Sequence, residues 1–142
     1  SAREQMMLAS WLGGQSLSMA GLGVIHGIAG ELGAIKDYHH GEVCGRLLLP
    51  FLTLLDESPH PQQAVLMQEL NAALFGQGSE RPAETLKQWL MANAGLAFWQ
   101  DPQRLSVDEV DWILARSNSK NSLLSYSREQ QRWMLEQAYC IG

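Results

Sequence analysis

The chain has 142 residues, of which 46% are hydrophobic, 18% charged and 8% aromatic, and this length predicts one domain or at most two very small ones. The apolar content is too high, and the charge too low, for a disordered tail. The longest nearly apolar run, residues 47–55, is far shorter than the roughly 20 residues that a membrane-spanning helix needs. The net charge of −5 argues against electrostatic binding to nucleic acid.

Two cysteines, Cys44 and Cys140, are too few for a disulfide framework, and such a low count is typical of proteins in a reducing compartment. The first residues do not show the charged segment and apolar run of a secretory signal peptide. We therefore expect a cytoplasmic protein with neither a nucleic acid nor a membrane as its partner.

Apolar residues recur at helical spacing along the chain, and no stretch alternates apolar and polar residues as a half-buried strand does. In chain order, this spacing predicts helices over residues 4–20, 41–55, 62–75 and 82–94, then one after Ser106 and one after Ser127. Pro50 is expected to bend or restart the second of these. The predicted fold is all-α, with six or seven helices packed as an orthogonal, bundle-like domain.

Several helix ends have recognisable signals. Gly76 is placed to end one helix, and Pro82 suits the first turn of the next. Residues 106–109 (Ser-Val-Asp-Glu) and 127–130 (Ser-Arg-Glu-Gln) both have the capping-box pattern of a helix start. The polar residues 117–125 between them predict a linker.

The most informative segment is residues 19–50. It holds three of the four histidines, His26, His39 and His40, and six of the 13 glycines fall between Gly21 and Gly41. A histidine on an apolar helix face is most often a packed core residue. However, glycines let backbone or a bound group approach closely, and imidazole is a good ligand for Fe²⁺ or Zn²⁺. Two imidazoles are still only part of a catalytic metal site, which usually has three protein ligands.

Two stretches of this segment carry a family resemblance. Residues 2–34 read AREQMMLASWLGGQSLSMAGLGVIHGIAGELGA, and residues 39–51 read HHGEVCGRLLLPF. They resemble the C-terminal domain of the iron-containing (group III) alcohol dehydrogenase family, in the dehydroquinate synthase-like superfamily. That family has the runs A-R-E-x-M-x-x-A-S and N-A-G-L-G-x-x-H-x-x-x-H-x-L-G, followed by P-H-G and an apolar L-L-P.

The resemblance implies a metal site. His26 matches the first histidine of the family's helix motif and His40 matches the histidine of P-H-G, and both are metal ligands in the family. His39 stands at the family's proline position, which makes it the weaker candidate. The family's other two ligands, an Asp and a His four apart, lie on an earlier helix, but no aspartate precedes His26 in this chain.

The expected catalytic residue is missing. Gly30 stands where many family members have a second histidine that faces the nicotinamide and the substrate, and Glu31 replaces the usual proline. Glu31, a water molecule or an altered substrate would have to take over, so the catalytic residue stays unknown. The resemblance further implies that Gly27 and Gly30 admit the nicotinamide end of the cofactor.

The family has two domains, and these 142 residues hold no glycine-rich nucleotide-binding unit. We therefore expect residues 1–142 to be one helical metal-binding domain, a fragment without the Rossmann-like domain that binds NAD or NADP. The complete protein would interconvert small alcohols with aldehydes or ketones using Fe²⁺ or Zn²⁺, and the fragment alone would be inactive. The alternative is a non-catalytic helical scaffold or interaction domain derived from that family.

The remaining candidates have structural interpretations. The five tryptophans are expected to pack in the core or between helices, although a missing domain would leave its docking surface exposed and favour a homo-oligomer. Cys44, near the expected site, is interpreted as a buried structural thiol. Arg46 either faces a cofactor phosphate or extends along its apolar helix to solvent.

Overall fold

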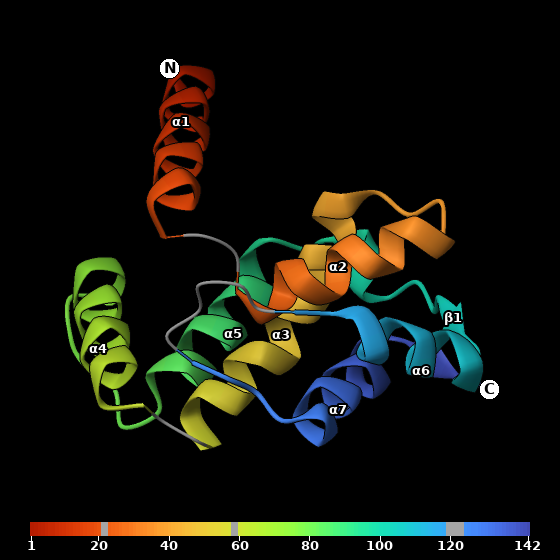
Figure 1. The fold of residues 1–142 in the computed structure, drawn as a ribbon. Helices are drawn as coiled ribbons and strands as arrows, with labels where there is room; N and C mark the ends of the chain where they lie inside the picture. The colour runs from red at the N-terminus through yellow and green to blue at the C-terminus, as the bar shows by residue number, and fades with distance from the viewer. Residues whose placement is uncertain (21–22, 58–59, 119–123) are drawn as a thin grey trace.

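The computed structural model describes residues 1–20, 23–57, 60–118 and 124–142. Figure 1 shows that helices make up most of this part of the chain: α1 (Ala2–Ala20), α2 (Val24–Ile35), α3 (His40–Glu57), α4 (Pro61–Phe75), α5 (Pro82–Asn93), the short 3-10 helix η1 (Ala97–Trp99), α6 (Val107–Arg116) and α7 (Arg128–Ala138). The predicted all-α class is confirmed. None of the described helices is long and apolar enough to cross a membrane.

Two very short strands, which no sequence pattern predicted, join the C-terminal end to the segment before α6. β1 (Arg104–Leu105) and β2 (Cys140–Ile141) pair in parallel. The backbone N–H of Cys140 donates to the carbonyl of Gln103 at 2.9 Å, and that of Gly142 donates to Leu105 at 3.1 Å. This pairing fixes the end of α7 beside the start of α6.

The main core lies where α2, α3, α6 and α7 meet. Each helix contributes fully buried apolar side chains, among them Ile28 and Leu32, Val43 and Leu47, Val110 and Ile113, and Met134 and Leu135. Burying one such side chain stabilises the fold by roughly 1.5–3 kcal/mol. Helix α3 lies in the middle, because it packs against α2, α5 and α7. The core therefore holds α2 and α3 in a fixed relation to each other.

A smaller core joins α3 to α5, where Leu52 and Leu55 pack with Ala83. Next to it, the buried carboxylate of Asp56 accepts hydrogen bonds from the first backbone N–H groups of α5. Its Oδ1 lies 3.1 Å from the nitrogen of Ala83, and its Oδ2 lies 2.8 Å from that of Glu84. An acidic group at a helix N-terminus satisfies free donors and complements the helix dipole. Asp56 thus caps a helix that begins far along the chain.

Helix α3 runs through Pro50 without interruption, so the helix does not restart there. Arg46, on the same helix, is buried and points inward rather than to solvent. Its guanidinium donates to Glu42 Oε1 from Nη2 at 3.1 Å and to the carbonyl of Asp101 from Nη1 at 2.8 Å. Glu42 Oε1 also accepts from Gln103 Nε2 at 3.0 Å. Arg46 therefore connects α3 to residues 101–103. It neither extends to solvent nor is free to face a cofactor phosphate, the two roles considered from the sequence.

The predicted helix ends are confirmed. Both capping boxes form, with the Ser106 hydroxyl 3.1 Å from the nitrogen of Glu109 and the Ser127 hydroxyl 3.2 Å from that of Gln130. Gly76 follows α4 with a left-handed φ of 76°, a conformation that costs glycine little. These ends follow the local sequence because the contacts that form them involve only neighbouring residues.

Two helices expose apolar faces. Figure 1 shows α1 standing apart from the other helices, and its large apolar side chains are exposed: Met6, Met7, Leu8, Trp11, Leu12 and Met19. On α4, large apolar side chains are also exposed: Val65, Leu66, Leu70 and Leu74. The side of α4 that faces the protein instead buries Asn71, whose Nδ2 donates to the carbonyl of Pro82 at 2.8 Å.

Some of the tryptophans pack against other parts of the protein, and others are exposed. Trp112 and Trp133 pack against the main core, and Trp99 donates from Nε1 to the carbonyl of Gly45 at 3.1 Å. Trp89 is half exposed but its ring lies 6.1 Å from that of Phe75 on α4. Trp11 is 61% exposed, so the prediction that it packs in the core or between helices is wrong.

Candidate metal centre

The two histidines singled out from the sequence come together between α2 and α3. His26 lies in the first turn of α2, and His40 is the first residue of α3. His26 Nδ1 lies 3.1 Å from His40 Nε2, and the two rings stack with their centroids 5.3 Å apart. Because α2 and α3 share the main core, their packing brings together two residues that are 14 apart in sequence.

A third side chain, Cys44, joins this pair. Its Sγ lies 3.5 Å from His40 Nε2 and 3.8 Å from His26 Nδ1. All three donor atoms lie within 4.8 Å of one another, while His39, exposed at the end of the loop before α3, is not part of this group. Imidazole nitrogen and sulfur are ligands that borderline cations such as Zn²⁺ and Fe²⁺ accept. The donor set therefore fits a divalent transition-metal ion.

The pKa values of His26 and Cys44 are shifted in opposite directions. Burial lowers the pKa of His26, and the nearby charge of His40 lowers it further. Both effects favour the neutral imidazole, the form that binds a metal. Burial raises the pKa of the Cys44 thiol, because desolvation disfavours the charged thiolate. His40 is exposed, so the group is open to solvent on one side.

The two glycines assigned to the cofactor have different surroundings. A Cβ added to Gly27 would lie 2.1 Å from the carbonyl oxygen of Asn118, so the chain itself closely approaches this glycine. A Cβ on Gly30 would meet nothing within 4 Å, and Gly30 is exposed. Glu31, next to it, is half-buried. Of these two glycines, only Gly30 thus leaves an open backbone surface on α2.

One Asp-x-x-x-His spacing occurs in the chain, from Asp56 to His60. It follows His26 rather than preceding it, and the Asp56 carboxylate is occupied by the N-terminus of α5. Neither residue belongs to the group formed by His26, His40 and Cys44. The spacing alone therefore does not identify a second pair of metal ligands.

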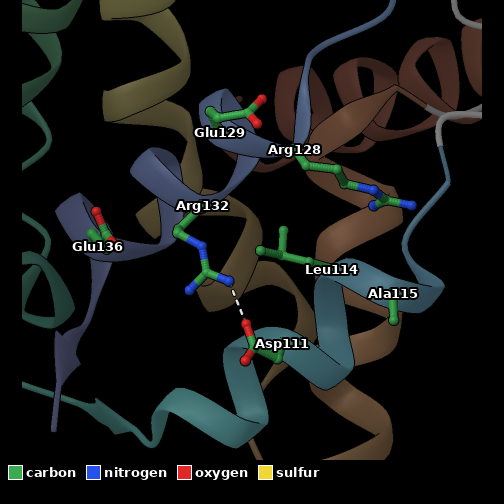
Figure 2. A pocket seen from close by; sticks show the side chains of 7 residues that line it. All are labelled: Asp111, Leu114, Ala115, Arg128, Glu129, Arg132 and Glu136. Atoms are coloured by element: carbon green, nitrogen blue, oxygen red, sulfur yellow. Dashed lines mark hydrogen bonds and ion pairs between the residues drawn. The ribbon is translucent and has the colours of Figure 1, made fainter.

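Another hollow lies between α6 and α7, away from the histidines. Figure 2 shows its lining: Asp111, Leu114, Ala115, Arg128, Glu129, Arg132 and Glu136. Arg132 pairs with Asp111 across the hollow, and Arg128 Nη1 donates to the hydroxyl of Ser117 at 2.9 Å. Because both guanidinium groups already have partners within the chain, this hollow is a weak candidate for binding an anion.

The comparisons with known proteins identify the family of the chain. Residues 1–101 match the model of the Fe-containing alcohol dehydrogenase family, C-terminal. The chain belongs to this family. It is 26% identical to alcohol dehydrogenase 4 of Saccharomyces cerevisiae (strain ATCC 204508 / S288c) over 144 aligned residues, which cover 97% of the chain and 37% of that protein. It is also 36% identical to 1,3-propanediol dehydrogenase of Klebsiella pneumoniae over 69 residues, 49% of the chain and 18% of that protein.

The chain therefore spans little more than a third of the length of the yeast alcohol dehydrogenase that it matches. No solved structure matches it significantly. The family match includes α1 to α5, and with them His26, His40 and Cys44. Sequence analysis identified both histidines but interpreted Cys44 as a structural thiol. Its position four residues after His40 was the available signal, because residues four apart lie on one face of a helix.

Proposed function

We propose that this chain is the metal-binding part of an oxidoreductase that interconverts small alcohols with aldehydes or ketones, using Fe²⁺ or Zn²⁺ and either NAD or NADP. The observation that carries the proposal is the 3.1 Å approach of His26 Nδ1 to His40 Nε2. Membership of the iron-containing alcohol dehydrogenase family supports the reaction class. The names of the relatives, an alcohol dehydrogenase and a propanediol dehydrogenase, point in the same direction.

Each residue of the centre has its own part in this proposal. His26 and His40 hold the ion, which when bound would act as a Lewis acid on the oxygen of the substrate. Gly30 leaves room on the exposed side of α2 for the nicotinamide end of the cofactor. Gly27 would contribute through its backbone only. Glu31 stands beside Gly30 and is the available group to accept or release a proton where the family has histidine.

The other parts of the enzyme would lie outside these residues. A nucleotide-binding domain beyond the 142 residues would hold NAD or NADP, and the chain on its own would be inactive. Two free cysteines suit a reducing compartment, which supports a place in the cytoplasm. The negative net charge supports a small-molecule substrate rather than a nucleic acid.

A second candidate is a helical scaffold domain that keeps the family's frame without its chemistry. Gly30 favours it, because a glycine cannot transfer a proton. A scaffold has no need of a metal ion, so metal binding separates the two candidates.

Calorimetric titration of the 142-residue chain with Zn²⁺, and with Fe²⁺ under anaerobic conditions, tests the proposal. We expect one ion per chain, with binding lost in His26→Ala and His40→Ala and kept in His39→Ala. His39 is the matched control because it is exposed and adjacent to His40 but outside the group. Binding that depends on His39 would overturn the ligand assignment. No metal binding by the wild-type chain would favour the scaffold.

A further inference from the structure

Cys44 lies on the face of α3 that carries His40, one helical turn further along. Residues four apart on a helix are neighbours, and the Cys44 sulfur lies 3.5 Å from His40 Nε2. The same sulfur reaches across to α2, where it lies 3.8 Å from His26 Nδ1. The side chain is only partly buried. A thiol that served packing alone would have no reason to lie against two imidazole nitrogens.

The spacing of the three donor atoms matches a single tetrahedral ion. With Zn–N bonds of about 2.0–2.1 Å and Zn–S bonds of about 2.3 Å, neighbouring ligands are separated by about 3.4 Å for two nitrogens and about 3.6 Å for nitrogen and sulfur. The observed separations are 3.1 Å between the nitrogens, and 3.5 and 3.8 Å from nitrogen to sulfur. Shifts of a few tenths of an ångström would therefore let one ion contact all three.

Resting on the proposed function, we propose that Cys44 is a third metal ligand, so that these 142 residues supply a His₂Cys donor set. On binding, the thiol proton leaves to solvent and the sulfur coordinates as a thiolate. Thiolate is a soft ligand that favours Zn²⁺ over harder ions such as Mn²⁺. His40 is exposed, so the three donors are accessible to an ion from solvent.

Cobalt substitution tests this ligand directly. Co²⁺ occupies zinc-type sites, and a coordinated thiolate adds a sulfur-to-cobalt charge-transfer band in the near ultraviolet to the visible bands of the ion. We expect this band in the wild-type 142-residue chain and in Cys140→Ser, and its loss in Cys44→Ser. Cys140 is the matched control, because it is the other free cysteine and is exposed on β2. Cys44→Ser should also weaken Co²⁺ binding roughly 100-fold.

The outcomes separate this inference from the proposed function. The wild-type chain could show visible cobalt bands that are lost in the His26 and His40 variants, but no charge-transfer band. That result would support the two-histidine site and rule out Cys44 as a third ligand. Absence of any cobalt binding would overturn both. Cys44→Ala serves as a second variant, and circular dichroism checks that each variant keeps its helices.

The sulfur should also confer a preference for softer ions. In that case Cys44→Ser should change the affinity for Mn²⁺ less than threefold, much less than the affinity for Co²⁺. An equal loss of affinity for Mn²⁺ and Co²⁺ would contradict that preference.

Discussion

His26 Nδ1 and His40 Nε2 lie 3.1 Å apart although the two residues lie in the first turns of different helices. Two unprotonated ring nitrogens cannot face each other at this distance without repulsion between their lone pairs, so a shared proton or a shared cation must lie between them. In this protein the distance follows from the core, since Ile28 of α2 and Val43 of α3 are buried in the same cluster. The candidate metal centre is therefore positioned by packing that does not depend on a metal ion.

The first prediction concerns the two glycines of α2 near this centre. Gly27→Ala should destabilise the protein by about 1–3 kcal/mol, because the new Cβ would be forced against the carbonyl of Asn118, 2.1 Å away. Gly30→Ala should instead stabilise it by up to about 1 kcal/mol, since alanine is the better helix former and nothing lies within 4 Å of the new methyl group. Urea unfolding followed by circular dichroism measures both, and changes of the same sign would contradict the prediction.

The sequence predicted the parts of the fold that depend on neighbouring residues. Both capping boxes and the left-handed Gly76 are confirmed because each needs only a few adjacent residues. Spacing alone did not define α2, since its three glycines obscure the apolar pattern that Ile28 and Leu32 form. His26 was identified on this helix from the histidines and glycines of its segment and from the family resemblance, rather than from periodicity.

Features that depend on contacts between distant residues escaped prediction. Asp56 caps α5 from 27 residues away, and Arg46 donates to a carbonyl 55 residues away. The spacing of apolar residues predicted helix α4, but it does not say which face meets the core, and the apolar Leu66 is exposed. Cys44 was missed as a candidate ligand because the sulfur acquires its second neighbour, His26, only when α2 packs on α3.

The second prediction concerns the cap that Asp56 provides. Asp56→Ala should cost about 1–2 kcal/mol of stability, because it removes an acceptor from two backbone N–H groups at the start of α5. Asp56→Asn should have a smaller effect, since the amide oxygen still accepts one hydrogen bond. Glu57→Ala is the control, because Glu57 is adjacent and exposed. Thermal unfolding measures the three variants, and equal losses for Asp56→Ala and Glu57→Ala would contradict the role of the cap.

The third prediction is a pH dependence that involves Glu109. Lys36 Nζ lies 2.7 Å from Glu109 Oε1, and this hydrogen bond is the main reason that the pKa of Glu109 lies below its usual 4.5, with the Ser106 backbone N–H as the next cause. Because folding lowers this pKa, its contribution to stability is fully present above pH 4.5 and is lost as the pH falls through the lower folded value. The destabilisation caused by Glu109→Gln should therefore shrink on acidification.

Urea unfolding of the wild-type chain and Glu109→Gln at a series of pH values from 7 downwards, on the order of one unit apart, measures this dependence. Asp108→Asn is the matched control, because Asp108 lies in the same first turn of α6 and is exposed. A difference between the wild-type chain and Glu109→Gln that stays constant down to the lowest pH would contradict the prediction.

The last prediction concerns the exposed face of α1, which we propose as the surface through which the 142-residue chain self-associates. Met7, Leu8, Trp11 and Leu12 lie on one side of this helix, and all four are exposed. A contiguous apolar face of this kind tends to be buried against another surface. A second copy of the chain offers the same face, and two such helices can bury each other's stripe. We therefore expect a mass in sedimentation equilibrium that rises with protein concentration.

Trp11→Glu should weaken this self-association by roughly tenfold or more, because a carboxylate would have to be desolvated in the interface. Ser10→Glu introduces the same charge on the opposite side of α1 and should leave the association unchanged, which makes it the matched control. Equal effects of the two variants would indicate that charge alone, rather than the apolar face, governs association. A wild-type chain that stays monomeric at every concentration would show that this face of α1 is not a surface for a second copy.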